Sequence, residues 1–170
     1  MRNKHFAFRQ MYDGIANELK SQVCIIVPSY IDSRPYEERS KIIIDGIWDT
    51  GATISAVAQN VIDKLGLKQT GAVPIGTAGG YITCPTYIID LALPNRIVIP
   101  DLIVTGNDSL MSCDMLIGMD VIGNGDFAIS NPKGKTCFSY CLPPHNKPID
   151  LYEKTQKVDK NYKIHSALKK

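Results

Sequence analysis

Apolar stretches rich in β-branched residues recur along the chain, with short polar or glycine-containing segments between them. The stretches occupy residues 23–31, 41–48, 72–76, 81–93, 96–104 and 126–130. Gly, Pro, Asn and Asp stand where the chain can reverse direction, at 45–46, 78–80, 94–95, 106–108 and 123–125. This rhythm predicts an all-β fold of short strands joined by hairpins.

Two segments depart from the strand pattern. Between residues 55 and 65, the spacing of Val57, Val61 and Leu65 places all three side chains on one face of a helix. Gly66 then supplies a stop signal for that helix. A second segment, residues 118–122, is long enough for a single helical turn. We therefore expect one principal short helix in a fold made otherwise of strands.

Length and composition favour a single domain. The chain has 170 residues, of which 44% are hydrophobic, so it can bury one substantial core but not two. We expect the domain to cover residues 21–145, after an N-terminal segment over residues 1–20. Residues 146–170 are polar, rich in lysine and without sustained apolar periodicity, which predicts a solvated or disordered tail.

The charge balance narrows the expected partners. A formal net charge of +2 does not by itself imply a nucleic-acid or membrane-surface partner. A nucleic-acid module using the lysine tail would need basic and aromatic residues interleaved on its strands, a pattern that is missing here. No apolar run has the length of a bilayer-spanning helix, and the first residues lack the apolar stretch of a secretion signal. We predict no nucleic acid, no membrane association and a cytoplasmic location.

The cysteines are Cys24, Cys84, Cys113, Cys137 and Cys141. Their odd number and irregular spacing favour reduced thiols over a disulfide framework. Cys137, Cys141 and His145 follow one another at four-residue steps, a spacing that can suggest a metal site. A four-ligand site needs a further partner, and nothing nearby in the sequence supplies one. The prediction is no metal and no cofactor.

The segment Trp48-Asp49-Thr50-Gly51-Ala52 directly follows a strongly apolar stretch, so it leaves a carboxylate at the end of an expected strand. Asp and Gly are common turn residues, and a turn alone would account for the Asp-Thr-Gly triplet. The neighbouring residues favour a functional role for this triplet over a simple turn. A hydrophobic residue followed by Asp-Thr-Gly-Ala resembles the active-site loop of the retropepsin-like aspartic peptidases, the family of retroviral proteases and their cellular and bacterial relatives.

Two further segments resemble the same family, in the family's order. Leu116-Ile117-Gly118 resembles the apolar pair and glycine of the psi loop, which frames the catalytic strand. Residues 75–82 resemble the flap, a glycine-rich hairpin that closes over substrate. The resemblance covers roughly residues 23–140. It implies that residues 21–145 form a retropepsin-like closed barrel, a single lobe of the acid protease fold.

The resemblance also assigns site residues. Asp49 would be the catalytic carboxylate, and Thr50 and Gly51 would support the active-site loop. The expected substrate-binding residues are Ala52, Thr53, Gly76, Thr77, Ala78, Gly79, Gly80 and Tyr81. Tyr81 could equally pack on the sheet as a strand aromatic. The other acids are expected to cap turns or face solvent, namely Asp45, Asp63, Asp90, Asp101, Asp120 and Asp126.

Two positions depart from the retroviral pattern. Many members have an acid after the Ala and an arginine after the downstream Gly, where this chain has Thr53 and Met119. Loss of both partners of an ion pair leaves no buried charge unpaired, so we expect the fold to tolerate the change. Substrate recognition near Thr53 is expected to differ.

Amide hydrolysis needs a base that activates water and an acid that protonates the leaving nitrogen, and two carboxylates sharing one proton supply both. The chain has one Asp-Thr-Gly motif, so the second carboxylate has to come from Asp49 of another copy. The sequence therefore predicts an aspartic endopeptidase that hydrolyses peptide or protein substrates as a symmetric homodimer. The alternative is a catalytically silent retropepsin-like module for dimerisation or peptide binding.

Overall fold

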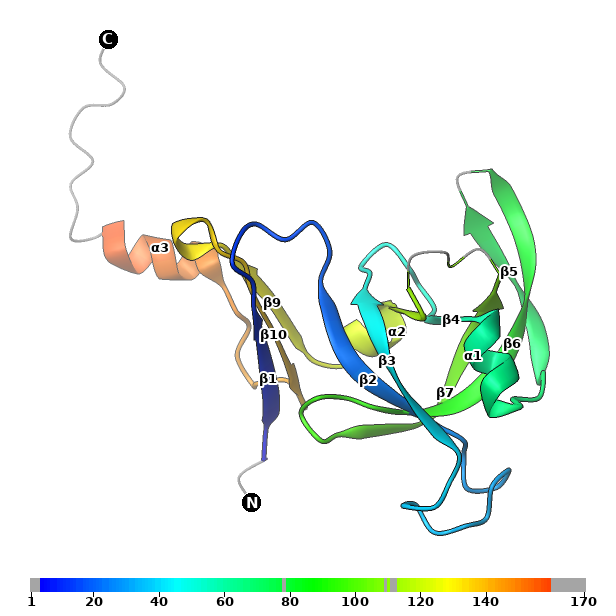
Figure 1. The fold of residues 1–170 in the computed structure, drawn as a ribbon. Helices are drawn as coiled ribbons and strands as arrows, with labels where there is room; N and C mark the ends of the chain where they lie inside the picture. The colour runs from blue at the N-terminus through cyan, green and yellow to red at the C-terminus, as the bar shows by residue number, and fades with distance from the viewer. Residues whose placement is uncertain (1–3, 78, 109, 111–112, 160–170) are drawn as a thin grey trace.

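The structure is a computed structural model, and it describes residues 4–77, 79–108, 110 and 113–159 (Figure 1). The strands are β1 (Phe6–Met11), β2 (Lys20–Ile26), β3 (Lys41–Trp48), β4 (Ala56–Ala58), β5 (Gly71–Thr77), β6 (Gly80–Ala92), β7 (Val98–Asn107), β8 (Met115–Ile117), β9 (Asp126–Ser130) and β10 (Cys137–Leu142). The helices are α1 (Gln59–Leu65), α2 (Met119–Ile122) and α3 (Leu151–Asp159), with a 3-10 turn at Pro132–Gly134. The predicted all-β fold is confirmed.

The larger sheet closes into a ring of strands. Its order is β2-β3-β8-β4-β7-β6-β5, and β2 also pairs with β6. The pairs β3–β8 and β4–β7 are parallel, whereas β2–β3, β2–β6, β4–β8 and β6–β7 are antiparallel. Strand β5 lies outside the ring and forms a hairpin with the first part of β6, which Figure 1 shows extending beyond the body of the molecule.

A second sheet joins the two ends of the domain. Its order is β1-β10-β9, with both pairs antiparallel. Residues 6–11, which belong to the segment expected to precede the domain, pair with residues 137–142. Figure 1 shows this sheet beside the ring, with α3 following it. Residues 6–11 of the N-terminal segment therefore form a strand of the folded structure.

Aromatic side chains fill the space between the two sheets. The ring of Trp48 lies 4.8 Å from that of Tyr140 and 5.3 Å from that of Phe138, centroid to centroid. Phe138 and Tyr140 are fully buried, and the Tyr140 hydroxyl donates to the carbonyl of Val121 at 2.7 Å. Burial raises the pKa of Tyr140 to about 12. The end of β3 is thus held in the core directly before Asp49.

The helices match the expectations in part. Gly66 ends α1 in the left-handed conformation, as predicted, with φ at 61°. The helix begins at Gln59, because residues 56–58 extend as β4 between β7 and β8. The single turn expected at 118–122 is α2. In the tail, α3 was not expected; its start is capped by Asp150, whose carboxylate accepts from the Glu153 N–H at 2.9 Å.

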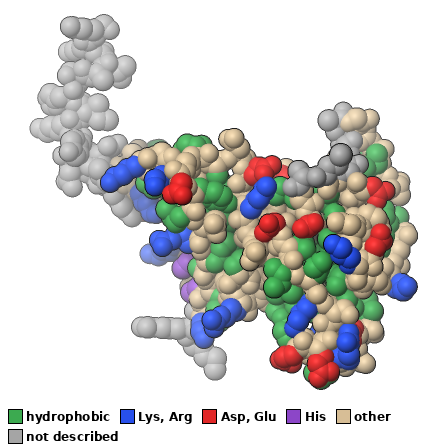
Figure 2. All heavy atoms as spheres, in the orientation of Figure 1, with side chains coloured by type: hydrophobic (Ala, Val, Ile, Leu, Met, Phe, Trp, Pro, Cys, Tyr) green, Lys and Arg blue, Asp and Glu red, His purple; other side chains and the backbone are tan. Residues whose placement is uncertain are grey.

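Two further properties concern the chain as a whole. All five cysteines lie in the described part of the chain, and all are free thiols. Among the described residues, none of the helices has both the length and the apolar character needed to cross a membrane. Figure 2 shows acidic, basic and hydrophobic side chains mixed over one face of the molecule, in keeping with the small net charge.

Candidate active site

Asp49 follows Trp48, whose backbone and side chain are both hydrogen-bonded. The Trp48 N–H donates to the carbonyl of Leu19 at 2.9 Å, and its indole Nε1 donates to the Ser21 hydroxyl at 2.9 Å. The Asp49 N–H donates to the carbonyl of Ile117 at 2.9 Å, which continues the parallel pairing of β3 with β8. These bonds place the Asp49 backbone at the end of a strand anchored in the core.

The loop after Asp49 turns back on its own carboxylate. The Gly51 N–H donates to Oδ1 of Asp49 at 2.8 Å. A Cβ at position 51 would lie 3.1 Å from the same oxygen, closer than most side-chain contacts allow. Glycine therefore lets the loop bring its N–H to the carboxylate. Since Asp49 is half-buried and Gly51 exposed, the carboxylate remains reachable from solvent.

The psi-loop residues pack directly against this loop. The Met119 N–H donates to the carbonyl of Ala52 at 2.8 Å. A Cβ at Gly118 would lie 2.7 Å from that carbonyl oxygen and 3.0 Å from the backbone carbon of Ile54. The close approach of the two loops requires glycine at position 118. The structure thus brings Leu116, Ile117 and Gly118 to the base of the Asp49 loop.

A carboxylate that the sequence interpretation set aside ties the two loops together. Asp120 accepts from the Ser55 hydroxyl at 2.7 Å and from the Ser55 N–H at 2.8 Å. The Gly118 N–H in turn donates to the Ser55 hydroxyl at 3.0 Å, and Ser55 is fully buried. The expectation that Asp120 caps a turn or faces solvent was therefore incomplete. Its position at the first turn of α2, two residues after Gly118, was the available signal.

The two positions that depart from the retroviral pattern are both on the surface. Thr53 is exposed, and 42% of Met119 is exposed. The hydrogen bonds between Ser55 and Asp120 connect the same two segments one or two residues further along the chain. This connection explains in physical terms why an ion pair between positions 53 and 119 is dispensable.

A cleft of about 400 Å³ separates the Asp49 loop from the β5–β6 hairpin. Asp49, Gly51, Ala52 and Thr53 line one side. The hairpin contributes Pro74, Ile75, Gly76, Ile82 and Cys84, and the remaining lining residues are Ile54, Ala56, Thr105, Asn107 and Leu116. Two segments that the sequence singled out separately therefore face one cavity. The apolar lining from Ile75, Ile82 and Leu116 was not predicted individually.

The remaining flap residues lie toward the tip of the hairpin. Gly79 and Gly80 are exposed, and Thr77 pairs with Gly80 across the turn. Tyr81 is 85% exposed and does not line the cleft, and its ring lies over its partner Gly76, where a Cβ would be 3.6 Å from Cε1 of the ring. Ala78 lies outside the described residues. The expected hairpin is present, and Gly76 is the predicted flap residue that reaches the cleft.

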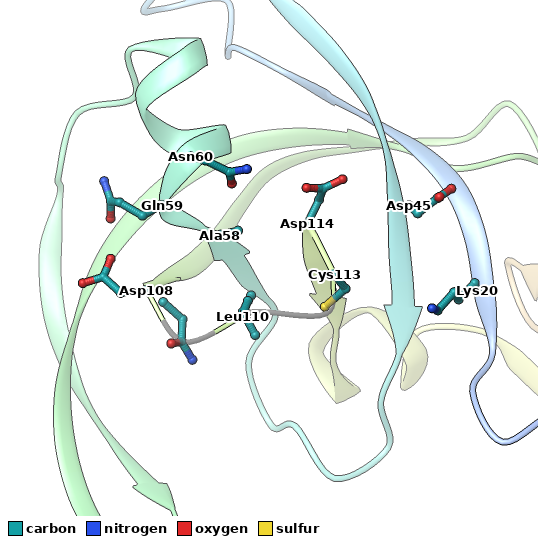
Figure 3. Close-up of a pocket in the computed structure, with 10 residues that line it drawn as sticks. Lys20, Asp45, Ala58, Gln59, Asn60, Asp108, Leu110, Cys113 and Asp114 are labelled. Atoms are coloured by element: carbon teal, nitrogen blue, oxygen red, sulfur yellow. The ribbon is translucent and has the colours of Figure 1, made fainter.

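A slightly larger pocket, of about 450 Å³, contains none of the predicted site residues (Figure 3). It lies beside the start of α1 and is lined by Gln59, Asn60 and the acids Asp45, Asp108 and Asp114, among others. Asp45 and Asp114 precede the paired residues Gly46 and Met115 of adjacent strands, which accounts for their proximity. Because the Asp49 carboxylate lies elsewhere, the cleft under the hairpin is the candidate site.

Comparisons with known proteins agree with this arrangement. Residues 43–124 match the family described as "gag-polyprotein putative aspartyl protease". This segment includes the Asp49 loop, the hairpin and the psi loop. Among curated proteins, none matches this sequence.

The fold is similar to that of a retropepsin-like aspartic protease from Rickettsia conorii, with a TM-score of 0.50. That comparison covers 83% of this chain and 98% of the other, at 12% identity. The simian foamy virus (mac) protease is also similar, with a TM-score of 0.41 and 14% identity over 62% of this chain and 92% of the other. The fold is therefore retropepsin-like, and residues 43–124 are similar to the aspartyl protease family that their motifs resemble.

Proposed function

We propose that the protein is an aspartic endopeptidase that acts as a symmetric homodimer, with Asp49 of each subunit supplying one catalytic carboxylate. The observation that carries the proposal is the position of Asp49 on a cleft roofed by a glycine-containing hairpin. The cleft offers apolar side chains from Ile75, Ile82 and Leu116, which suit the side chains of an extended peptide.

The chemistry follows from bringing two such carboxylates together. Like charges a few ångströms apart are not both ionised, so the pair holds one proton. The ionised member accepts a proton from the attacking water, and the protonated member donates to the carbonyl oxygen of the scissile amide. As the tetrahedral intermediate collapses, the first carboxyl passes the proton that it took from water to the leaving nitrogen, and a hydroxyl of the intermediate returns its proton to the second carboxylate. A single subunit offers one Asp-Thr-Gly loop, so the reaction requires the second copy.

The surface on the other side of Asp49 supports a twofold contact. A groove of about 370 Å³ borders Asp49 and Thr50 there, and its lining includes Ile15, Phe127 and Ile129. Ile15 is 60% exposed and Ile129 is 47% exposed. Burial of such residues against a second copy would be favourable and would bring the two Thr50 side chains toward each other. In this arrangement Thr50 bonds across the axis and Gly51 keeps the loop compact.

The residues of the cleft then take distinct roles. Ala52, Thr53 and Gly76 contact substrate, and Thr77, Gly79, Gly80 and Tyr81 belong to the part of the hairpin that closes over it. The alternative function is a silent dimerisation or peptide-binding module. The bond from the Gly51 N–H to Asp49 favours the enzyme, because a binding module has no need of a carboxylate oriented in this way.

Digestion of an unbiased peptide library tests the proposal. The wild type and Asp49→Ala, purified in parallel, should differ by a set of sequence-specific cuts that the wild type alone makes. Mass spectrometry of the products detects them, and light scattering on the same samples gives the mass of the assembly. Cuts shared by both proteins come from contaminants. A dimer that binds peptides and makes no cuts of its own is the silent module.

The hairpin tip can be tested with a matched pair of glycines. Gly80 has φ at 114° and Gly134 has φ at 74°, and a Cβ at either would meet no neighbouring atom within 4 Å. Alanine at either position therefore costs backbone strain alone, about 1–3 kcal/mol. We expect Gly80→Ala to lower kcat/KM by about tenfold or more, since lid closure completes the site. Gly134→Ala should leave kcat/KM unchanged at a similar loss of thermal stability. Equal turnover in the two variants would show that the hairpin is a structural turn.

A further inference from the structure

A cluster of metal-binding side chains lies at the end of the three-stranded sheet, outside the cleft. His5, Cys141 and His145 each place one potential ligand atom within 4.8 Å of the other two. His5 directly precedes β1, Cys141 is in β10, and His145 follows β10. The pairing of Phe6 with Leu142 and of Ala7 with Cys141 brings the first of these residues to the other two. Figure 2 shows histidine atoms at the surface beside this sheet.

The hydrogen bonds of both histidines leave the same nitrogen available. Nδ1 of His5 lies 3.0 Å from the carbonyl oxygen of Pro143, and Nδ1 of His145 lies 2.5 Å from Oδ2 of Asp126. Carbonyl and carboxylate oxygens accept, so Nδ1 of each ring carries a proton, and the lone pair that a metal ion would use is that of Nε2. Metal-binding histidines in proteins usually have this arrangement, in which a carboxylate or carbonyl fixes the ring.

Cys141 completes a ligand set of two imidazoles and one thiol. It is buried, and its thiol donates weakly to the same Pro143 carbonyl at 3.6 Å. Burial, together with the nearby Asp126, raises the pKa of the Cys141 thiol, so a cation that binds there has to displace a proton. Two imidazoles and a thiolate suit Zn²⁺, whereas Ca²⁺ and Mg²⁺ prefer oxygen ligands.

The geometry points to a zinc site formed by His5, Cys141 and His145, with Asp126 orienting His145 and water at the fourth position. Ligand atoms of tetrahedral zinc lie about 3.3–3.8 Å apart, so the three side chains have to rearrange to bind the ion. The two imidazoles are stacked at 4.5 Å and 12°. On binding, the rings tilt so that both lone pairs converge on the ion. The sheet, which contains Cys141 and is flanked by His5 and His145, stays in place.

The sequence suggested Cys137, Cys141 and His145 as possible ligands, and the fold explains why Cys137 is not one of them. Cys137 and Cys141 are four residues apart in β10, which separates their Cα atoms by about 13 Å. Cys137 pairs with Met11, at the opposite end of β1 from His5. It therefore lies too far away to share an ion with Cys141. The ligand in its place, His5, is more than a hundred residues distant along the chain and is brought in by strand pairing.

Titration of the full chain, free of any histidine tag, with Zn²⁺ and Co²⁺ tests the site. We expect one ion per chain and a rise in melting temperature with zinc, because the ion binds the folded state. Bound Co²⁺ should show a thiolate-to-cobalt charge-transfer band in the near ultraviolet. Cys141→Ser should remove this band, and His145→Gln, at an exposed position, should weaken binding and abolish the zinc-dependent rise in melting temperature.

Two further variants separate this site from non-specific binding to thiols. Asp126→Asn should weaken zinc binding by about 10–100-fold, as loss of an orienting partner does at other sites. Cys137→Ser, in the same strand, should bind zinc as the wild type does. The proposal is wrong if the wild type shows no saturable one-to-one binding. It is equally wrong if Cys137→Ser loses as much affinity as Cys141→Ser, or if bound Co²⁺ lacks the thiolate band.

Discussion

Asp49→Asn should abolish peptidase activity and leave the assembly intact. The amide oxygen can still accept the Gly51 N–H, which lies 2.8 Å from Oδ1 of Asp49, so the loop keeps its conformation. The amide cannot accept a proton from water, and general acid–base catalysis is worth about 10²–10⁴-fold. We expect kcat/KM to fall by at least about 10²-fold. Steady-state cleavage of a peptide identified in the library digest measures the loss, and the elution volume on size exclusion checks the assembly.

Mixed dimers provide the sharper form of this experiment. When wild type and Asp49→Asn subunits exchange randomly in equal amounts, about a quarter of the dimers carry two carboxylates. If both are needed, activity follows the square of the wild-type fraction. Activity that follows this fraction linearly after complete exchange would mean that each subunit works alone, and the shared site would be refuted. Wild type mixed with Gly134→Ala serves as the control, because neither subunit lacks its carboxylate.

Asp120→Ala should cause a large loss of stability, because the carboxylate of Asp120 ties two loops together. The substitution removes two charge-assisted hydrogen bonds to Ser55 and leaves a buried N–H and hydroxyl with fewer partners. Each such bond contributes about 1.5–3 kcal/mol, and water can partly replace the acceptor because Asp120 is half-buried, so we expect a loss of about 2–4 kcal/mol in the free energy of unfolding. Urea denaturation with an unchanged m-value measures it.

Asp63→Ala is the matched control for this stability measurement. Asp63 is exposed on α1 and accepts one hydrogen bond from Gln59 in the same helix, at 2.8 Å. Its removal should change stability by less than about 0.5 kcal/mol. Asp120→Ala should also reduce turnover, since the loop that follows Asp49 loses its support. If Asp120→Ala is as stable as Asp63→Ala, the hydrogen bonds between Ser55 and Asp120 contribute nothing measurable to the connection between the loops.

The fold could be predicted from the sequence wherever local signals and tertiary pairing agree. Hairpin signals at 78–80 and 94–95 correspond to the turns between β5 and β6 and between β6 and β7. The helix was predicted to begin too early, because Val57 has the spacing from Val61 and Leu65 that one face of a helix requires. Their partners in β7 and β8 decided the matter, and those partners are distant in sequence. Tertiary pairing overrode the local propensity.

In the candidate site, too, some features follow from local sequence and others from contacts between distant segments. The Asp49 loop, the hairpin glycines and Gly118 have motifs that can be recognised from residue order. The roles of Ser55, Asp120 and His5 depend on which loops and strands are adjacent in space. Asp120 is bonded to a residue 65 positions away, and His5 is 138 positions from the carbonyl that orients it. No pattern within a short window of sequence contains that information.

The sheet formed by β1, β10 and β9 sets the order in which the molecule can be completed during synthesis. Phe6 finds its partner Leu142 only after nearly the whole domain has left the ribosome, and contacts of such long separation make folding slow. Phe8 and Phe138 pack on Trp48, the residue before Asp49 and the single tryptophan of the chain. The environment of that tryptophan therefore becomes native late. A nascent chain that lacks β10 therefore has no finished Asp49 loop, and the hydrolytic machinery that we propose is assembled only after Leu142 has been synthesised.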